Sequence, residues 1–139
     1  MQSLAEKTDY KVQRLSDLLY VQNGEEYFNS IVKTFKSPNE DVENFLKTKA
    51  IQVTKLKTAT TYLVYVQRSD FEIDLVGYFS LAMKMLALKK VGLSRTSEKV
   101  IGRFGCYDDN STSYVIPAVL VAQFGRNLTK RLNHFQEQI

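Results

Sequence analysis

Hydrophobic residues in the first half of the chain recur at two different periods, which predicts both strands and helices. Residues 10–15 alternate between two faces, a pattern that favours a strand. Residues 27–35 and 42–56 instead place apolar side chains three or four positions apart. That spacing is typical of amphipathic helices, so we expect one strand followed by two helices.

Two local signals mark where these helices should begin. Asn23 precedes the first apolar-periodic stretch and is expected to cap it. Ser37 is followed by Pro38 and Glu40, which is a capping box with proline at the first helical position. We therefore predict a helix from Pro38 to about Leu56.

Three later stretches predict strands. Residues 61–67 and 72–85 are rich in aromatic and β-branched side chains and lie close in sequence, so they should form an antiparallel hairpin, with a bulge near Gly77. Residues 113–121 are apolar on both faces, which indicates a central strand covered on two sides. Pro117 lies inside this strand and predicts a local break in pairing. The resulting fold class is α+β, a mostly antiparallel sheet flanked by helices.

The remaining stretches are less regular. Apolar residues at spacings of four, three and four predict a final helix, at Leu128, Leu132, Phe135 and Ile139. Residues 84–103 hold six basic side chains against the single acid Glu98. We expect either a solvated, mobile insertion between strands or a basic arm that contacts phosphate on a cofactor or an RNA.

Composition narrows the class of protein. A chain of 139 residues, 44% of them hydrophobic, suits a single domain spanning 1–139. The net charge of +4 is compatible with a phosphate-bearing ligand. Cys106 is the single cysteine and His134 the single histidine, so neither an internal disulfide nor a metal ligand set is expected. We find no signal peptide and no apolar stretch long enough to span a membrane, and expect a cytoplasmic protein.

The end of the 113–121 strand carries the candidate chemistry. Gln123, Gly125, Arg126 and Asn127 follow it directly, and a helical pattern begins after them. A strand, a glycine turn and a helix N-terminus form a geometry that binds phosphates, because the first N–H groups of a helix lack internal partners. The alternative is purely structural: Gly125 turns the chain and Asn127 caps the last helix.

The residues from Pro117 to Asn127 resemble the signature region of the GNAT superfamily, the acyl-CoA-dependent N-acetyltransferases. The upstream stretches Thr61–Val66 and Val76–Lys84 are similar to the second and third strands of that fold, most of all in small bacterial, toxin-like members. The match spans roughly residues 41–127. It departs from the family pattern at the phosphate turn, where Gln123 and Gly125 are two positions apart and no final Gly or Ala appears.

The resemblance implies transfer of an acetyl group from acetyl-CoA to a primary amine on a small molecule, a protein or an aminoacyl-tRNA. It places the pyrophosphate of coenzyme A at Gln123, Gly125, Arg126 and Asn127. The pantetheine arm would pair with the backbone of three strand residues, namely Val119, Leu120 and Val121. No residue matches the tyrosine that serves as general acid in the family, so the catalytic residues are unknown.

The family's C-terminal strand, helix and hairpin have no counterpart in this sequence. We expect an inactive remnant, a sheet completed by another chain, or an open edge covered by dimerisation, and we predict a homodimer. Two rival functions stay open. One is a non-catalytic GNAT-like module that binds a protein or a nucleic acid. The other is a basic RNA-binding protein that uses residues 84–103 and whose affinity falls steeply with salt.

Overall fold

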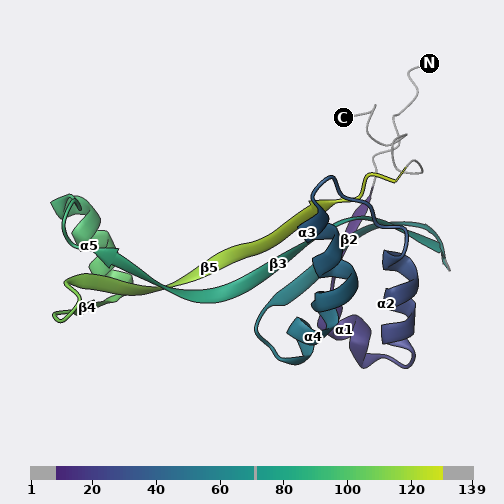
Figure 1. Ribbon diagram of the computed structural model, residues 1–139, viewed down its shortest axis with the longest axis horizontal. Coiled ribbons are helices and arrows are strands. Elements are labelled where there is room, and N and C mark those ends of the chain that lie inside the picture. Colours follow the sequence, from purple (N-terminus) through teal and green to yellow (C-terminus); the bar gives the residue numbers. More distant parts are fainter. Residues whose placement is uncertain (1–8, 71, 130–139) are drawn as a thin grey trace, which may run out of the picture. The chain divides into compact units, whose positions relative to one another are not determined.

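The computed structural model describes residues 9–70 and 72–129. It contains a five-stranded sheet in the order β1-β2-β3-β5-β4 (Figure 1). Along the chain, helices connect β1 to β2 and β3 to β4. The β1–β2, β2–β3 and β4–β5 pairings are antiparallel. The chain divides into two units, one formed by Met1–Leu81 with Val121–Ile139 and the other by Ala82–Leu120. The expected mostly antiparallel α+β fold is confirmed.

The first unit contains the predicted strand–helix–helix–hairpin succession. The long predicted helix is three consecutive segments, with a π-helical turn between two α-helical ones. The bounds are β1 Tyr10–Arg14, α1 Leu15–Tyr20, α2 Gly24–Val32, α3 Glu40–Asn44, π-helix η1 Phe45–Lys49, α4 Ala50–Lys55 and β2 Thr60–Ser69. β3 (Glu72–Lys89) begins in this unit and β5 (Ser113–Arg126) ends in it.

Both predicted helix caps differ from the structure. Asn23 precedes α2, but it adopts a left-handed conformation with φ of 59° and makes no side-chain capping bond. The second helix begins two residues later than expected. Its cap is Asn39, whose side chain accepts a hydrogen bond from the N–H of Asp41 at 3.0 Å. Ser37 instead accepts a bond from the N–H of Asn39, so the Ser-Pro pair shapes the approach to the helix rather than its first turn.

The π-helical turn has a tertiary partner. A π-turn shifts hydrogen bonding from the fourth to the fifth residue and so alters which carbonyls are satisfied within the helix. The hydroxyl of Tyr78 in β3 donates to the carbonyl of Val42 at 2.5 Å, just before η1. The Tyr78 ring also stacks on Phe45 and meets Phe35 edge-on. Burial of this side chain raises the pKa of the Tyr78 hydroxyl, which therefore stays protonated as a donor.

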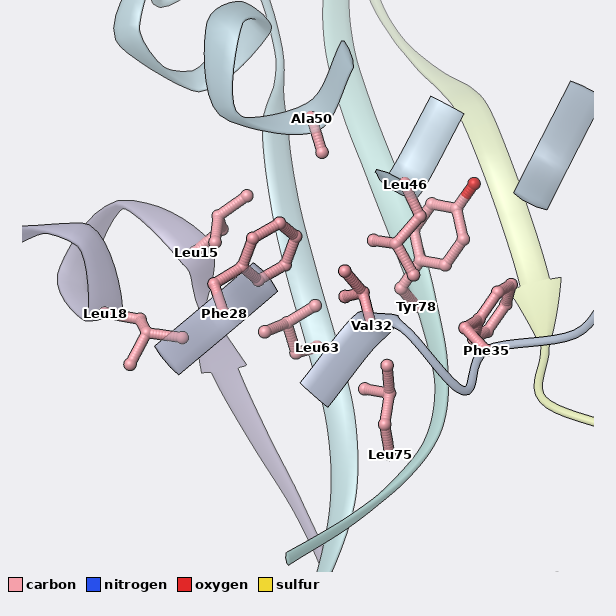
Figure 2. Packing of buried hydrophobic residues seen from close by; sticks show 10 residues of the cluster. All are labelled: Leu15, Leu18, Phe28, Val32, Phe35, Leu46, Ala50, Leu63, Leu75 and Tyr78. Carbon is pink, nitrogen blue, oxygen red and sulfur yellow. The ribbon is translucent and has the colours of Figure 1, made fainter. Parts of the chain in front are cut away.

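The core of the first unit lies between the helices and one face of the sheet (Figure 2). Its members come from α1, α2, the loop after it, the α3–α4 helix and two strands. They are Leu15, Leu18, Phe28, Val32, Phe35, Leu46, Ala50, Leu63, Leu75 and Tyr78. The cross-strand hydroxyl pair Thr61–Ser80, at 2.6 Å, is also fully buried on this face, where each group satisfies the other.

The hairpin prediction is confirmed, including an irregularity beside Gly77. Val64 pairs with Gly77 but Tyr65 pairs with Leu75, so one residue of β3 is left over between them. Such an extra residue is a β-bulge. β3 continues to Lys89, four residues beyond the predicted end.

The second unit contains the far end of β3, helix α5 (Arg95–Phe104), β4 (Cys106–Asp108) and the first part of β5. The predicted turn at 108–111 is present. The side chain of Asp108 accepts hydrogen bonds from the N–H of Asn110 and from the hydroxyl of Ser111. These bonds lower the pKa of Asp108, because they favour its ionised form. The helix predicted after Asn127 falls on residues 130–139 and lies outside the described residues.

Candidate functional site

The predicted phosphate turn is not a turn. β5 runs without interruption to Arg126, so Gln123, Gly125 and Arg126 are strand residues. The conformational propensity of glycine favoured a turn at Gly125, but tertiary packing keeps this residue in the strand. The strand position of Gly125 brings β5 against β3 and the helices, at a spacing that any side chain would obstruct. A helix N-terminus next to these residues is therefore not part of the described structure.

Gly77 in β3 and Gly125 in β5 lie close to each other. A Cβ added to Gly77 would lie 2.5 Å from the carbonyl oxygen of Gly125. A Cβ added to Gly125 would lie 2.4 Å from the side chain of Val42 and 3.0 Å from the Tyr78 ring. Both glycines are thus required by space rather than by backbone conformation. Gly125 therefore has a packing role in the core of the first unit.

Asn127 fastens the end of β5 to two other segments. Its Nδ2 donates to the carbonyl of Leu75 at 2.8 Å, and its Oδ1 accepts from the backbone N–H groups of Lys36 and Thr129. Its own N–H donates to the carbonyl of Val76, beside the bulge. The side chain is 3% exposed. Asn127 therefore satisfies backbone groups around the end of β5, which is a structural role. The helix that it was expected to cap lies outside the described residues.

The three residues expected to hold the pantetheine arm are exposed. Val119, Leu120 and Val121 are 60%, 44% and 59% exposed, so the expectation that this strand is covered on both sides is wrong for the described residues. β4 pairs only with residues 113–115 of β5. Beyond Val115, no other described strand lies on that side of β5. Its backbone groups are therefore available for a ligand or for another strand.

The segment expected to be a mobile insertion or a basic arm contains an ordered helix, α5. Ser94 caps it, and its side chain accepts a hydrogen bond from the N–H of Ser97 at 3.1 Å. The signal was present in the sequence: a serine before the stretch, apolar residues at Val100, Ile101 and Phe104, and Gly105 at its end. The many charged residues of this stretch led to its interpretation as an insertion or a basic arm instead of a helix.

Basic side chains line α5 at every fourth position. Arg95, Lys99 and Arg103 are all exposed and share one side of the helix, because residues four apart lie one above another. Among the described residues, none of the three forms an ion pair. Lys90 is different: its Nζ lies 3.9 Å from Glu98 and 5.5 Å from the centre of the Tyr107 ring. Lys90 therefore helps hold α5, while the stripe of three cations faces solvent.

The remaining candidate groups are dispersed. Cys106 is exposed and free, and Asp74 forms an ion pair with Arg68. Tyr62 stacks on Phe79, and the ring of Tyr114 contacts that of Tyr107. His134 lies outside the described residues. Residues 9–70 and 72–129 bring together no cluster of groups that could hold a metal ion. No helix within them is long and apolar enough to cross a membrane.

Comparison with known proteins identifies the fold. No family model matches the sequence, and no curated protein matches it. Among solved structures, a Tyr-to-Phe mutant of KacT matches with a TM-score of 0.59 and 16% identity, over 95% of this chain and 64% of that one. A Tyr-to-Phe mutant of the AtaT toxin matches with a TM-score of 0.56 and 14% identity, over 93% of this chain and 58% of that one.

AtaT in complex with acetyl-methionyl-tRNAfMet matches as well, with a TM-score of 0.56 and 17% identity, over 89% of this chain and 59% of that one. KacT and AtaT are GNAT proteins. The chain has the GNAT fold. It spans about three fifths of the length of the structures it matches. The fold resemblance inferred from residues 41–127 is thereby confirmed.

Proposed function

We propose that this chain acts as an N-acetyltransferase that transfers an acetyl group from acetyl-CoA to a primary amine. The observation that carries the proposal is the GNAT fold over most of the chain, together with an edge of β5 that pairs with no other described strand beyond Val115. Acyl transfer requires a thioester held beside the amine and donors placed for the developing oxyanion. Backbone N–H groups of an open strand are suitable donors for both tasks.

Three strand residues are proposed to hold the pantetheine arm. Val119, Leu120 and Val121 present an uncharged backbone edge, and pantetheine contains two amides that can pair with such an edge as a short strand would. Their exposed apolar side chains would lie along the aliphatic portion of the arm. Pro117, also exposed, lacks an N–H and so limits how far a paired ligand can extend towards β4.

The pyrophosphate is proposed to lie beyond the end of the same strand. Arg126 is exposed there and can donate two parallel hydrogen bonds to phosphate oxygens. Gln123 is partly exposed and supplies an amide donor. Gly125 and Asn127 would support this site indirectly, since they fix the end of β5 against β3.

The test is a calorimetric titration of acetyl-CoA into the purified protein, with Arg126→Ala as the variant and Lys33→Ala as the control. Lys33 is an exposed cation after α2, so its removal changes the net charge equally. Loss of a charge-assisted hydrogen bond costs about 1.5–3 kcal/mol, so we expect Arg126→Ala to weaken binding about tenfold or more. Absence of binding to the folded wild-type protein would overturn the proposal for this chain.

An aminoacyl-tRNA is the acceptor we favour among the three amine classes. AtaT, one of the structural neighbours, is seen with acetyl-methionyl-tRNAfMet. In this chain the stripe of Arg95, Lys99 and Arg103 on α5 presents three exposed cations to solvent. Phosphate contacts of this kind dominate affinity for nucleic acids.

The alternative function is a non-catalytic GNAT-like module that binds a protein or a nucleic acid through β5 or α5. It is favoured by two exposed features of the described residues, the edge of β5 beyond Val115 and the cations of α5. The two functions differ in one measurement. A catalytic protein binds acetyl-CoA and acetylates an amine acceptor, whereas the module binds its partner equally well with and without acetyl-CoA.

A further inference from the structure

Helix α5 turns its largest apolar side chain to solvent. Phe104 is 71% exposed and Val100 is 50% exposed. An amphipathic helix normally turns its large apolar residues inward. The inner side of α5 instead consists of Glu98 and Ile101, which are partly buried, and of Gly102, whose nearest neighbour is the ring of Tyr114. The position of Phe104 outside the packed part of this unit therefore needs an explanation.

The exposed ring lies beside the stripe of three cations on α5. Thr96, Val100 and Phe104 each follow one cation of the stripe, and residues four apart in a helix lie one above another. These three residues therefore form a second exposed line next to the stripe. Arg103 and Phe104 are consecutive at the end of the helix. The helix thus presents phosphate-binding side chains and an aromatic ring on adjoining lines.

The ring of Phe104 is available to a ligand. The other two aromatic residues of the unit contact each other, since the rings of Tyr107 and Tyr114 lie 5.1 Å apart. The Nζ of Lys90 also lies 5.5 Å from the centre of the Tyr107 ring. Among the described residues, Phe104 has no ring partner of this kind. Proteins that bind single-stranded nucleic acids combine such a ring, which stacks on a base, with cations that hold the backbone.

We propose that α5 binds an unpaired nucleotide of an RNA, with its base stacked on Phe104 and its phosphate beside Arg103. The inference rests on the proposed function, in which α5 contacts an RNA, and adds that the contacted part of the RNA is single-stranded. The bases of a duplex stack on one another, whereas those of loops and ends can offer a face to Phe104. Stacking tolerates any base, so the site selects unpaired structure rather than sequence.

A protein or a membrane fits this surface less well than an RNA. Stable protein interfaces bury about 800 Å² on each partner. The exposed side of α5 offers only two apolar side chains, Val100 and Phe104, beside its cations. Helices that lie in a membrane surface need a broad apolar side. A single ring is enough for a single base, and the charge of the stripe is complementary to phosphate.

The test compares two dye-labelled RNA hairpins by fluorescence anisotropy, without acetyl-CoA. One hairpin has a blunt end, and the other carries a short unpaired 3′ extension. We expect the wild-type protein to bind the extended hairpin about fivefold or more tightly, which is the effect of one stacked base. Phe104→Leu keeps an apolar side chain without the ring and should abolish this preference, whereas Phe104→Tyr should retain it. The matched control is Phe124→Leu, at a 74% exposed phenylalanine of the first unit, which should behave as the wild type.

A tryptophan at the same position reports the contact directly, because the chain contains none. The emission of Phe104→Trp should be quenched by the extended hairpin and not by the blunt one when both are bound. Circular dichroism checks that each variant is folded.

Three outcomes overturn the inference. Equal affinity of the wild-type protein for the two hairpins would leave only phosphate contacts at α5. A preference that Phe104→Leu retains would exclude stacking on the ring. Binding of neither hairpin would leave a protein as the partner of α5. The titration with acetyl-CoA needs no RNA, so it tests the proposed enzyme separately.

Discussion

Gly125 illustrates how a single residue can be required by space alone. The Cβ introduced by Gly125→Ala would meet Val42, Tyr78 and Phe35, three side chains that are packed together in the core. Overpacking of this kind costs about 1–3 kcal/mol. We therefore expect the free energy of unfolding, measured by urea denaturation, to fall by that amount.

The same substitution elsewhere in the chain provides the control for Gly125→Ala. Gly102 lies in α5 with open space around it, the nearest atom being 3.9 Å from an added Cβ. Gly102→Ala should raise helix stability by about 0.5–1 kcal/mol, because alanine loses less entropy in a helix. Equal effects of the two substitutions would contradict the packing argument.

Glu43 makes the stability of the first unit depend on pH. A hydrogen bond from Lys47, a bond from the backbone N–H of Ser37 and the charge of Lys36 lower the pKa of Glu43 from 4.5 to about 2. The folded pKa lies below the unfolded one, so the stabilisation is complete above pH 4.5 and is lost as the pH falls towards 2.

We expect Glu43→Gln to flatten the dependence of the urea midpoint on pH between 4.5 and 2 and to lower the midpoint at neutral pH. Glu72→Gln, at an exposed position at the start of β3, removes the same charge without these partners and is the matched control. A pH profile of Glu43→Gln that parallels the wild type would show that Glu43 is not the responsible group.

At the scale of elements, α5 carries the interaction that is easiest to test. A triple variant with acidic residues in place of Arg95, Lys99 and Arg103 reverses the charge of the stripe. If each contacts a phosphate, the slope of log affinity against log salt for an aminoacyl-tRNA should fall by about one unit per contact. Fluorescence anisotropy at several salt concentrations measures this slope.

The control variant reverses the charge of three exposed lysines of the first unit, with the same change in net charge. They are Lys33, Lys49 and Lys57. This variant should change the slope little, because these residues do not share a helix face. Equal losses in the two triple variants would mean that net charge, and not α5, governs RNA binding.

For the whole molecule, the open edge of β5 leads us to propose a homodimer. Residues 110–125 contain no charged side chain, so this edge lacks the charges that usually prevent strand pairing between chains. Light scattering at micromolar concentration should give a dimer mass. Val121→Lys places a charge on β5 and should yield monomer, whereas Val91→Lys, on an exposed turn, should not.

Acetyl-CoA provides a second check on the dimer, since the pantetheine arm and a partner strand would use the same backbone groups. Addition of acetyl-CoA should therefore shift the dimer towards monomer. A wild-type protein that is monomeric throughout the micromolar range would contradict the proposed dimer.

Most elements of the first unit can be predicted from the sequence, because their signals are local. The aromatic and β-branched residues of 61–67 and 72–85, close together in sequence, predicted the β2–β3 hairpin, and Gly77 predicted its irregularity. Helical spacing predicted α2 and the long helix ending near residue 55. Their caps were less predictable. Asn23 and Ser37 have the right chemistry, but the chosen cap depends on how the chain approaches the helix from the preceding core residue Phe35.

The conformation at the end of β5 depends on tertiary packing. In sequence, Gln123–Asn127 resembles a glycine turn before a helix. In the structure, Gly125 stays in the strand because β3 and the helices pack closely against it. The side chain of Asn127 forms hydrogen bonds with the backbone of Leu75 and Lys36. These partners are 52 and 91 residues away along the chain, so no local pattern could reveal them.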